Sequence, residues 1–418
     1  MTTLAKGFMM ILSKLPRLML LSRCVFVALA SVLILPIGVA SADQQPLKVF
    51  ILVGQSNMQG HAHVRTLEHV GMDPKTVPLL RAMQGDDGVP RVFENISISS
   101  LSKKGEKTGG LSTGFGADEN KIGPELTFGI YMQRHLGEPI LIIKTAWGGK
   151  SLNTDFRSPS AGPYEFNESQ IENLKKQGKD LAAITAAKVK ATGHYYRQTI
   201  EHVRTVLSDI KRVCPNYDAK RGYELAGFVW FQGWNDMVDR GTYPKRDQSG
   251  GYDRYTEALV HFIRDVRRDL SAPQLPFVIG VFGVGGPIDQ YLPDQRRYSG
   301  IHQNFRLAMA APASMPEFRD NTVAVLTERY WDMELRGLRA REAEIKQKVK
   351  VLQSEQKLSG DEKRVAQEKY QAEEFTRREM EILQKGVSNA EYHYLGSAKI
   401  MAKIGQGFAD AMARLLKD

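Results

Sequence analysis

The chain has 418 residues, of which 42% are hydrophobic and 25% are charged, and this is the composition of an ordinary globular protein. Its formal net charge is +10, but it has no basic motif interleaved with aromatic residues, so we predict no nucleic-acid partner. Only one of its two cysteines, Cys214, lies beyond residue 42. The chain after residue 42 therefore cannot form an internal disulfide. A hydrophobic core must supply the stability of its fold.

The first 42 residues have the pattern of a secretory signal peptide. Their only charges are four basic residues, an apolar run follows from Val25 to Val39, and Ala40-Ser41-Ala42 resembles a cleavage site. The apolar run is short for a membrane-spanning helix, which needs about 20 residues, and an uncleaved anchor is the alternative. Cleavage after about Ala42 would lower the net charge from +10 to a mildly basic +6. We therefore predict a secreted or periplasmic protein that has no membrane attachment after cleavage.

Beyond this segment, short apolar runs alternate with amphipathic stretches of helical length. Runs rich in Val, Ile and Phe are typical of strands buried on both faces of a parallel sheet. The predicted strands are Val49–Val53, Pro139–Lys144, Leu225–Phe231, Pro276–Val281 and Thr322–Leu326, and the predicted helices include Gly123–Leu136, Tyr195–Val213 and Tyr252–Leu270. We predict an α/β fold, a three-layer α/β/α sandwich with a flavodoxin-like parallel sheet, in which ligands bind at the carboxyl ends of the strands.

Two regions depart from the alternation. Residues 159–188 are polar and rich in lysine, which predicts an exposed loop with a short helix. Residues 330–386 are dense in Glu, Lys, Arg and Gln and break near Ser359-Gly360, which predicts a charged hairpin of two helices. We interpret it as a solvated insertion; an arm for a protein partner or for self-association is the alternative. The predicted domains are a signal peptide (1–42), one α/β domain (43–329 and 387–418) and the hairpin (330–386).

Ser56 follows the first predicted strand, two residues after Gly54. Glycine permits a tight turn there, which would place the hydroxyl at the carboxyl edge of the sheet, near the amides of the next helix. Met58 stands where the Gly-x-Ser-x-Gly turn of α/β-hydrolases has its second glycine, so that turn is not supported. Taken alone, a serine after a strand is as readily a helix N-cap as a nucleophile.

Three further blocks carry residues suited to ester chemistry. Gly148-Gly149 follows the second strand, and glycines let backbone amides approach a ligand closely. Gly233-Trp234-Asn235-Asp236 follows the third, and an asparagine amide is a neutral donor for an oxygen that becomes negative during attack. His393 precedes the predicted C-terminal helix, and a histidine with a near-neutral pKa is the natural base for a serine.

In this order the four blocks resemble the SGNH (GDSL-like) hydrolase superfamily. The serine block, Gly54-Gln55-Ser56-Asn57-Met58, looks closest to the branch of carbohydrate esterases that holds sialate O-acetylesterases and acetylxylan esterases. The resemblance spans Lys48 to about Leu415 without the charged hairpin. It implies a secreted esterase that hydrolyses O-acetyl esters on a sugar or polysaccharide and needs no metal or organic cofactor. Sialic acid, xylan, pectin and sulfated or otherwise acidic polymers all stay open as the carbohydrate.

The resemblance also implies residue roles. Ser56 is the catalytic nucleophile and His393 its base. The Ser56 and Gly149 amides and the Asn235 side chain form the oxyanion hole. The predicted substrate-binding residues are Gln55, Asn57, Gly148, Trp234 and Asp236, although Gln55 and Asn57 have the alternative role of ordering the serine turn.

The acid that orients His393 departs from the family pattern. The family usually places an aspartate three residues before the histidine, where this chain has Ala390. Glu391 is our candidate for the acid, and Asp236, Glu328 or a backbone carbonyl are alternatives. The missing aspartate also keeps open a non-catalytic protein that binds an acetylated glycan.

Three histidines, His61, His63 and His69, have a spacing seen in metal sites. No cysteine or carboxylate near them in sequence completes a ligand shell. We therefore predict no metal site.

Overall fold

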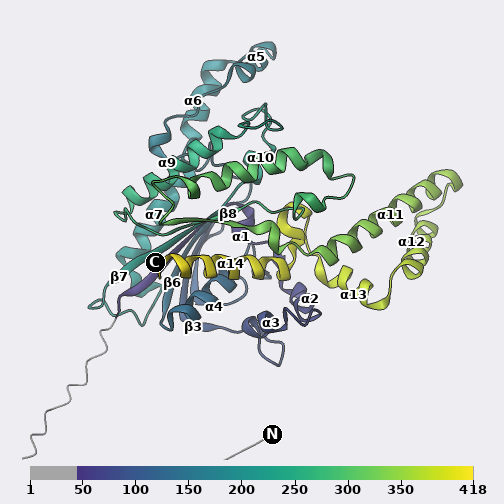
Figure 1. The fold of residues 1–418 in the computed structure, drawn as a ribbon, viewed down its shortest axis with the longest axis horizontal. Coiled ribbons are helices and arrows are strands. Elements are labelled where there is room, and N and C mark those ends of the chain that lie inside the picture. Colours follow the sequence, from purple (N-terminus) through teal and green to yellow (C-terminus); the bar gives the residue numbers. More distant parts are fainter. Residues whose placement is uncertain (1–44, 418) are drawn as a thin grey trace, which may run out of the picture. The chain divides into compact units, whose positions relative to one another are not determined.

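The core of the structure is a seven-stranded, mostly parallel sheet (Figure 1). In spatial order its strands are β4 (Gly105–Leu111), β3 (Phe93–Ser102), β6 (Ile140–Ala146), β1 (Leu47–Gly54), β7 (Tyr223–Phe231), β8 (Phe277–Val281) and β9 (Thr322–Leu326). Only β4 runs antiparallel to its neighbour. A separate antiparallel pair consists of β2 (Ala62–His63) and β5 (Lys121–Ile122). The computed structural model describes residues 45–417, so the predicted signal segment lies outside the described residues.

Helices cover both faces of the sheet (Figure 1). α4 (Glu125–Leu136) and α14 (Ala398–Leu415) pack side by side on one face, and α7 (His194–Ser208), α9 (Asp253–Asp269) and α10 (Ser299–Ala310) cover the other. This confirms the predicted α/β/α sandwich and all five predicted strands. None of the helices between residues 45 and 417 is long and apolar enough to span a membrane.

The remaining helices are shorter or lie outside the sandwich. They are α1 (Ser56–Gln59), α2 (Leu67–Gly71), α3 (Val77–Met83), α5 (Glu168–Lys176), α6 (Leu181–Ala191), α8 (Trp234–Val238), α11 (Met333–Gln356), α12 (Gly360–Glu374) and α13 (Arg377–Gly386). The 3-10 helices are η1 (Val64–Thr66), η2 (Pro159–Ala161), η3 (Ile210–Arg212), η4 (Ile288–Gln290), η5 (Arg296–Tyr298), η6 (Ala311–Ser314), η7 (Thr327–Tyr330) and η8 (Glu391–Gly396).

The central strand β1 shows why the apolar runs predict the sheet. It pairs with β6 on one side and β7 on the other, and all five side chains from Val49 to Val53 are 0% exposed. Burial of one such side chain contributes about 1.5–3 kcal/mol, so a continuous apolar run suits a strand with both faces covered. The pattern does not indicate β3 and β4, because serines interrupt the apolar residues of β3 and β4 is polar and rich in glycine.

One buried charge stands in the sheet close to the serine block. Lys144 in β6 is 1% exposed, and its Nζ lies 2.6 Å from Glu125 Oε2. The same Nζ donates to the backbone carbonyls of Gln59 and Phe115 at 3.0 and 2.8 Å. The Lys144 ammonium therefore ties the end of α1 to β6. Removing one partner would leave the other charge buried and unpaired, which is costly.

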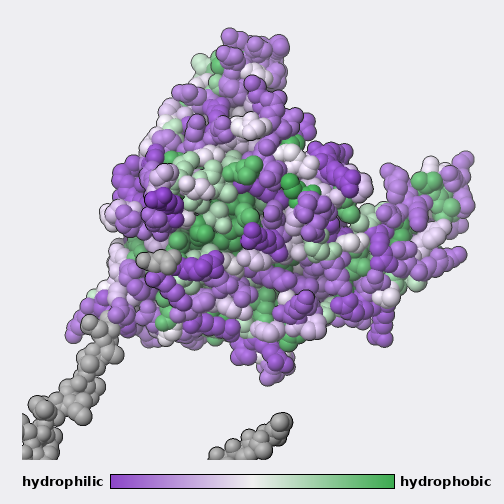
Figure 2. Space-filling model, viewed as in Figure 1, coloured by the Kyte–Doolittle hydropathy of each residue, from purple (hydrophilic) through white to green (hydrophobic). Residues whose placement is uncertain are grey.

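The charged region 330–386 folds into three helices, whereas the sequence pattern predicts two. α11 packs against both α12 and α13, and its inner side chains, such as Leu338 and Val349, are buried. The second predicted helix ends at Phe375 because Thr376 and Glu379 form a capping box that starts α13. Figure 2 shows a mostly hydrophilic surface over this region. The region 159–188 likewise contains two helices, α5 and α6, where one short helix was expected.

Candidate active site

The carboxyl ends of β6, β1 and β7 reach the same level of the sheet. Gly54, the last residue of β1, pairs with Ala146 of β6 and with Phe231 of β7. A Cβ on Gly54 would lie 2.1 Å from the Phe231 carbonyl oxygen, so only glycine fits there. The serine, glycine and Gly-x-Asn-Asp blocks follow these three strands and therefore meet at one edge of the sheet.

Ser56 is the first residue of α1 and is 7% exposed. A Cβ on Gly148 would lie 3.7 Å from Ser56 Cβ, so the glycine block lies directly beside the serine. Gly149 has a left-handed conformation with φ of 75°, which favours glycine. Neither glycine N–H donates to a backbone carbonyl of the described residues. These N–H groups are thus free of backbone partners close to the serine side chain.

Gln55 joins the serine block to the Gly-x-Asn-Asp block. Its Oε1 accepts hydrogen bonds from the backbone amides of Gly233 and Asn235 at 3.1 and 3.3 Å. Its Nε2 donates to Asn235 Oδ1 at 3.0 Å and lies 3.4 Å from Ser56 Oγ. Gln55 is 1% exposed and its polar atoms are bonded within the protein, which contradicts the prediction that it binds substrate. It instead fixes Asn235 with Oδ1 toward Gln55, so the Asn235 Nδ2 is not used in this contact.

Asp236 is also a structural residue rather than the predicted substrate ligand. It is 1% exposed, and its carboxylate accepts from the backbone amides of Leu152 and Asn153 at 2.7 and 3.0 Å. The side chains of Gln232 and Tyr243 donate to it as well, at 2.6 and 3.1 Å. Burial raises the pKa of Asp236 to about 6, and these four hydrogen bonds oppose that shift. Asp236 therefore ties the loop that follows Gly149 to the end of β7.

Two buried residues of the same edge complete this arrangement. Gln232, which sequence reasoning missed, donates to Gln55 Oε1 at 3.2 Å and to the Lys150 carbonyl at 3.0 Å. Its position directly before Gly233 in the motif is the signal that could have found it. Asn57 is 4% exposed and its Oδ1 has no hydrogen-bond partner among residues 45–417, so its role toward substrate stays a prediction.

His393 lies in η8, which packs against α1. Its Nδ1 is 3.0 Å from Asn389 Oδ1, and its ring stacks on that of His61 with centroids 4.0 Å apart and planes at 2°. Burial lowers the pKa of His393 to about 4, with smaller contributions from His61 and Lys121. The ring is therefore neutral at pH 7. No hydrogen bond joins it to Ser56 among residues 45–417, and such bonds are often long before substrate binds.

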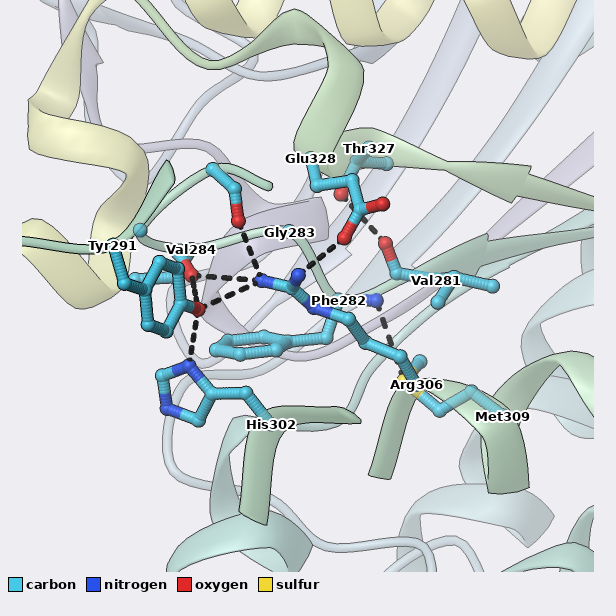
Figure 3. Close-up of polar contacts among 12 residues, drawn as sticks. Val281, Phe282, Gly283, Val284, Tyr291, His302, Arg306, Met309, Thr327 and Glu328 are labelled. Carbon is cyan, nitrogen blue, oxygen red and sulfur yellow. Dashed lines mark hydrogen bonds and ion pairs between the residues drawn. The ribbon is translucent and has the colours of Figure 1, made fainter. Parts of the chain in front are cut away.

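None of the carboxylates named as acids contacts His393. Glu391 accepts from Gln295 Nε2 at 3.1 Å, so the prediction that it orients the histidine is wrong in this structure. Figure 3 shows Glu328 paired with Arg306, whose guanidinium also donates to the carbonyls of Val284 and Gly286. Asp236 is held by the four donors described above. The residue on His393 Nδ1 is Asn389, four positions earlier in the sequence, and sequence reasoning missed it.

The three histidines with metal-like spacing have separate environments. His61 stacks on His393, whereas His63 Nδ1 accepts from the Arg65 amide at 3.1 Å. His69 is buried 3.7 Å from an Asp332 oxygen. No group of three or more His, Cys, Asp or Glu side chains between residues 45 and 417 is arranged to hold a metal ion.

A cavity of about 530 Å³ lies beside η8, the segment that carries His393. Trp234 and Tyr392 line it, with ring centroids 5.5 Å apart, and the Tyr392 ring is 4.5 Å from that of His393. The lining also includes further aromatic and charged residues, namely Tyr291, Tyr298, His302, Arg240, Arg297 and Asp294, beside aliphatic ones such as Met237 and Ile301. Aromatic faces with polar groups around them suit a sugar ring.

Comparison with known proteins gives one family. Residues 46–311 match the family described as carbohydrate esterase, sialic acid-specific acetylesterase. The matched segment holds Ser56, Gly149 and Asn235 and ends before His393. No curated protein sequence matches the chain.

Two solved structures are similar to this chain at low identity. A protein from Arabidopsis thaliana is 17% identical, with a TM-score of 0.35, and the match covers 67% of this chain and 85% of that one. A carbohydrate acetylesterase from Xanthomonas citri is 13% identical, with a TM-score of 0.35 and coverages of 67% and 50%.

Proposed function

Because the chain belongs to the carbohydrate esterase, sialic acid-specific acetylesterase family, we propose that it removes acetyl groups from a carbohydrate through a covalent acetyl–serine intermediate. One observation carries the mechanism. Hydrogen bonds of Gln55 and Asp236 hold Ser56, Asn235 and the loop after Gly149 together at one edge of the sheet. Nucleophile and oxyanion donors from three separate strands are the parts that acyl transfer requires.

In the first half of the reaction, Ser56 Oγ attacks the acetyl carbonyl carbon and its proton passes to His393 Nε2. The N–H groups of Ser56 and Gly149 and the Asn235 Nδ2 stabilise the negative oxygen of the tetrahedral intermediate. The bond to the sugar oxygen then breaks, and His393 returns the proton to that oxygen, which leaves as a hydroxyl.

The second half repeats these steps with water in place of the serine. His393 takes a proton from water, the resulting hydroxide attacks the acetyl–serine, and acetate leaves as Ser56 regains its proton. The sugar occupies the cavity beside Trp234 and Tyr392 during the first half. A neutral His393 at pH 7 supports its role as the base.

Export is a further part of the proposal. The basic, apolar and small-residue pattern of residues 1–42 supports a signal peptide that is removed after about Ala42. Amino-terminal sequencing of protein from the exported fraction should then begin near Asp43. Full-length protein in the membrane fraction would instead identify an uncleaved anchor.

The test of the mechanism compares wild type with Ser56→Ala. We expect wild type to release acetate from 4-nitrophenyl acetate and acetylated xylan, and to react at Ser56 with a fluorophosphonate. Ser56→Ala should lose both, because a triad without its nucleophile loses about 10⁶ in kcat in a well-studied hydrolase. A folded wild type that binds acetylated xylan, releases no acetate and takes no label would support the glycan-binding alternative.

A further inference from the structure

A serine–histidine pair needs a third group that fixes the imidazole tautomer. The base must present a bare Nε2 to the serine, so its proton must sit on Nδ1 and meet an acceptor. An aspartate usually provides that acceptor, but the three carboxylates considered above are all bonded elsewhere. The acceptor in this chain is therefore a different type of group.

The group on Nδ1 is the side-chain amide of Asn389, and its orientation is determined. Asn389 Oδ1 lies 3.0 Å from His393 Nδ1 and also 2.7 Å from the backbone nitrogen of Ala390. A backbone N–H can only donate, so the amide atom that faces it must be the oxygen. The same oxygen then accepts from His393, which places the proton on Nδ1 and leaves the lone pair on Nε2.

The backbone around the two residues closes into a loop that holds them face to face. The amides of Ser388 and Asn389 both donate to the Leu395 carbonyl, at 2.9 and 3.0 Å, and the His393 amide donates to the Ala390 carbonyl at 3.0 Å. Tyr394 and Leu395 both have left-handed φ values, 53° and 61°, which are strained for such residues.

Tyr394 explains how that strain is maintained. It is 0% exposed, and its hydroxyl accepts from the Gly283 amide at 2.9 Å and contacts Thr327 Oγ1 at 2.7 Å. Strained backbone persists only where surrounding contacts enforce it, and it concentrates at functional sites. The loop thus has a fixed conformation, and that conformation places Asn389 against His393.

The charges that surround the histidine are consistent with a neutral partner. His61 covers one ring face, Tyr392 packs against the ring at 4.5 Å, and Lys121 is the nearby charged group. A positive neighbour and burial both disfavour imidazolium, in line with the lowered pKa of His393.

We propose that Asn389 is the positioning residue of His393, so that the site uses a neutral serine–histidine–asparagine arrangement without an acid. The inference rests on the proposed function of Ser56 and His393. During attack the proton moves from Ser56 Oγ to His393 Nε2, while Asn389 Oδ1 keeps its hydrogen bond to the Nδ1 proton. The positive charge of the imidazolium then has no adjacent carboxylate, which makes this base weaker than one paired with aspartate.

The experiment measures 4-nitrophenyl acetate hydrolysis from pH 3.5 to 8 for wild type, Asn389→Ala, Asn389→Asp and Glu391→Gln. Asn389→Ala should lower kcat by about 10²–10⁴-fold with little change in KM, because general-base catalysis contributes that much. Asn389→Asp should retain activity and move the acid limb of kcat/KM to higher pH, because a carboxylate favours imidazolium. Glu391→Gln should leave the acid limb where it is. The matched control is Asn216→Ala, which removes the side chain of an exposed asparagine distant in sequence from Asn389.

Wild-type kcat and an unmoved pH profile in Asn389→Ala would overturn the proposal, and so would Glu391→Gln if it moved the acid limb. If Asn389→Ala does not fold, an unmoved limb in Asn389→Asp overturns it instead. Nitrogen NMR of His393 should show the proton on Nδ1 in wild type, and the opposite tautomer would contradict the inference. Fluorophosphonate labelling of Ser56 separates the serine mechanism from the role of Asn389. If wild-type protein takes no label, the serine mechanism itself has failed; if it takes the label, the results for the Asn389 variants bear on Asn389 alone.

Discussion

The two halves of the candidate site are held in different ways. The oxyanion half draws Gln55, Gln232 and Asp236 from two strands and joins them to a third through buried hydrogen bonds. In the histidine half, Asn389 and His393 lie four residues apart in one short loop. The neutral side-chain amide of Asn389 contacts the His393 ring directly. The first half depends on long-range pairing of strands, and the second on the conformation of one turn that the Tyr394 hydroxyl anchors to Gly283 and Thr327. Substitutions in the two halves should therefore fail in different ways.

Apart from substitutions of the nucleophile and of Asn389, the largest effect is expected in the oxyanion half. Asn235→Ala removes the Nδ2 donor and should lower kcat by about 10²–10³-fold, or about 2.7–4 kcal/mol of barrier. KM for 4-nitrophenyl acetate should change little, because the donor acts on charge that develops in the transition state. Steady-state kinetics check this, with Asn216→Ala as control. An unchanged kcat would remove Asn235 from the oxyanion hole.

The second effect concerns stability and again lies in the oxyanion half. The pKa of Asp236 is about 6 when folded and 3.8 ordinarily, so between these values the folded state holds a proton that the unfolded state has released. Its contribution to stability is thus fully present below pH 4 and falls by about 3 kcal/mol as the pH rises past 6. Urea unfolding of wild type and Asp236→Asn at pH 4 and 7 tests this. The free energy of unfolding of wild type minus that of Asp236→Asn should be smaller at pH 7 than at pH 4. An equal difference at the two pH values would contradict a raised pKa of Asp236.

The third effect lies in the histidine half and appears in wild type. Because the pKa of His393 is lowered to about 4, the base stays neutral well below the usual 6.5 of histidine. The acid limb of kcat/KM should have its midpoint near pH 4, provided that no other group of the free enzyme titrates there. A midpoint near 6.5 would mean that His393 is solvated in solution and that the difference between the two halves is smaller than the structure indicates.

The smallest effect tests the turn itself. Tyr394→Phe removes the hydroxyl that accepts from the Gly283 amide and leaves that buried N–H without its partner. We expect a loss of about 1–3 kcal/mol in the free energy of unfolding. Tyr392→Phe, on a side chain that is 42% exposed, is the control and should change stability by no more than about 0.5 kcal/mol. Equal stability of both variants would show that Tyr394 does not hold the loop.

Much of the fold could be predicted because its signal is local. Each continuous apolar run marks a strand covered on both faces, and five such runs with the helices between them are enough to predict a parallel sandwich. Strands β3 and β4 could not be predicted in this way, because their serine and glycine residues form no apolar pattern. The break at Phe375 escapes it too, since the capping box that starts α13 stands within an otherwise continuous run of helix formers.

The same distinction between local and tertiary information applies to the candidate site. By itself the sequence determined the sandwich, the position of Ser56 after β1 and the order of the four blocks, because strand periodicity and glycine turns are encoded in neighbouring residues. Only the tertiary structure decided that Gln55 and Asp236 are positioning residues, that Glu391 faces Gln295, and that Asn389 meets His393. Whether a polar side chain faces substrate or a buried partner depends on the register of distant strands and on the backbone conformation of a single turn, and composition and spacing record neither.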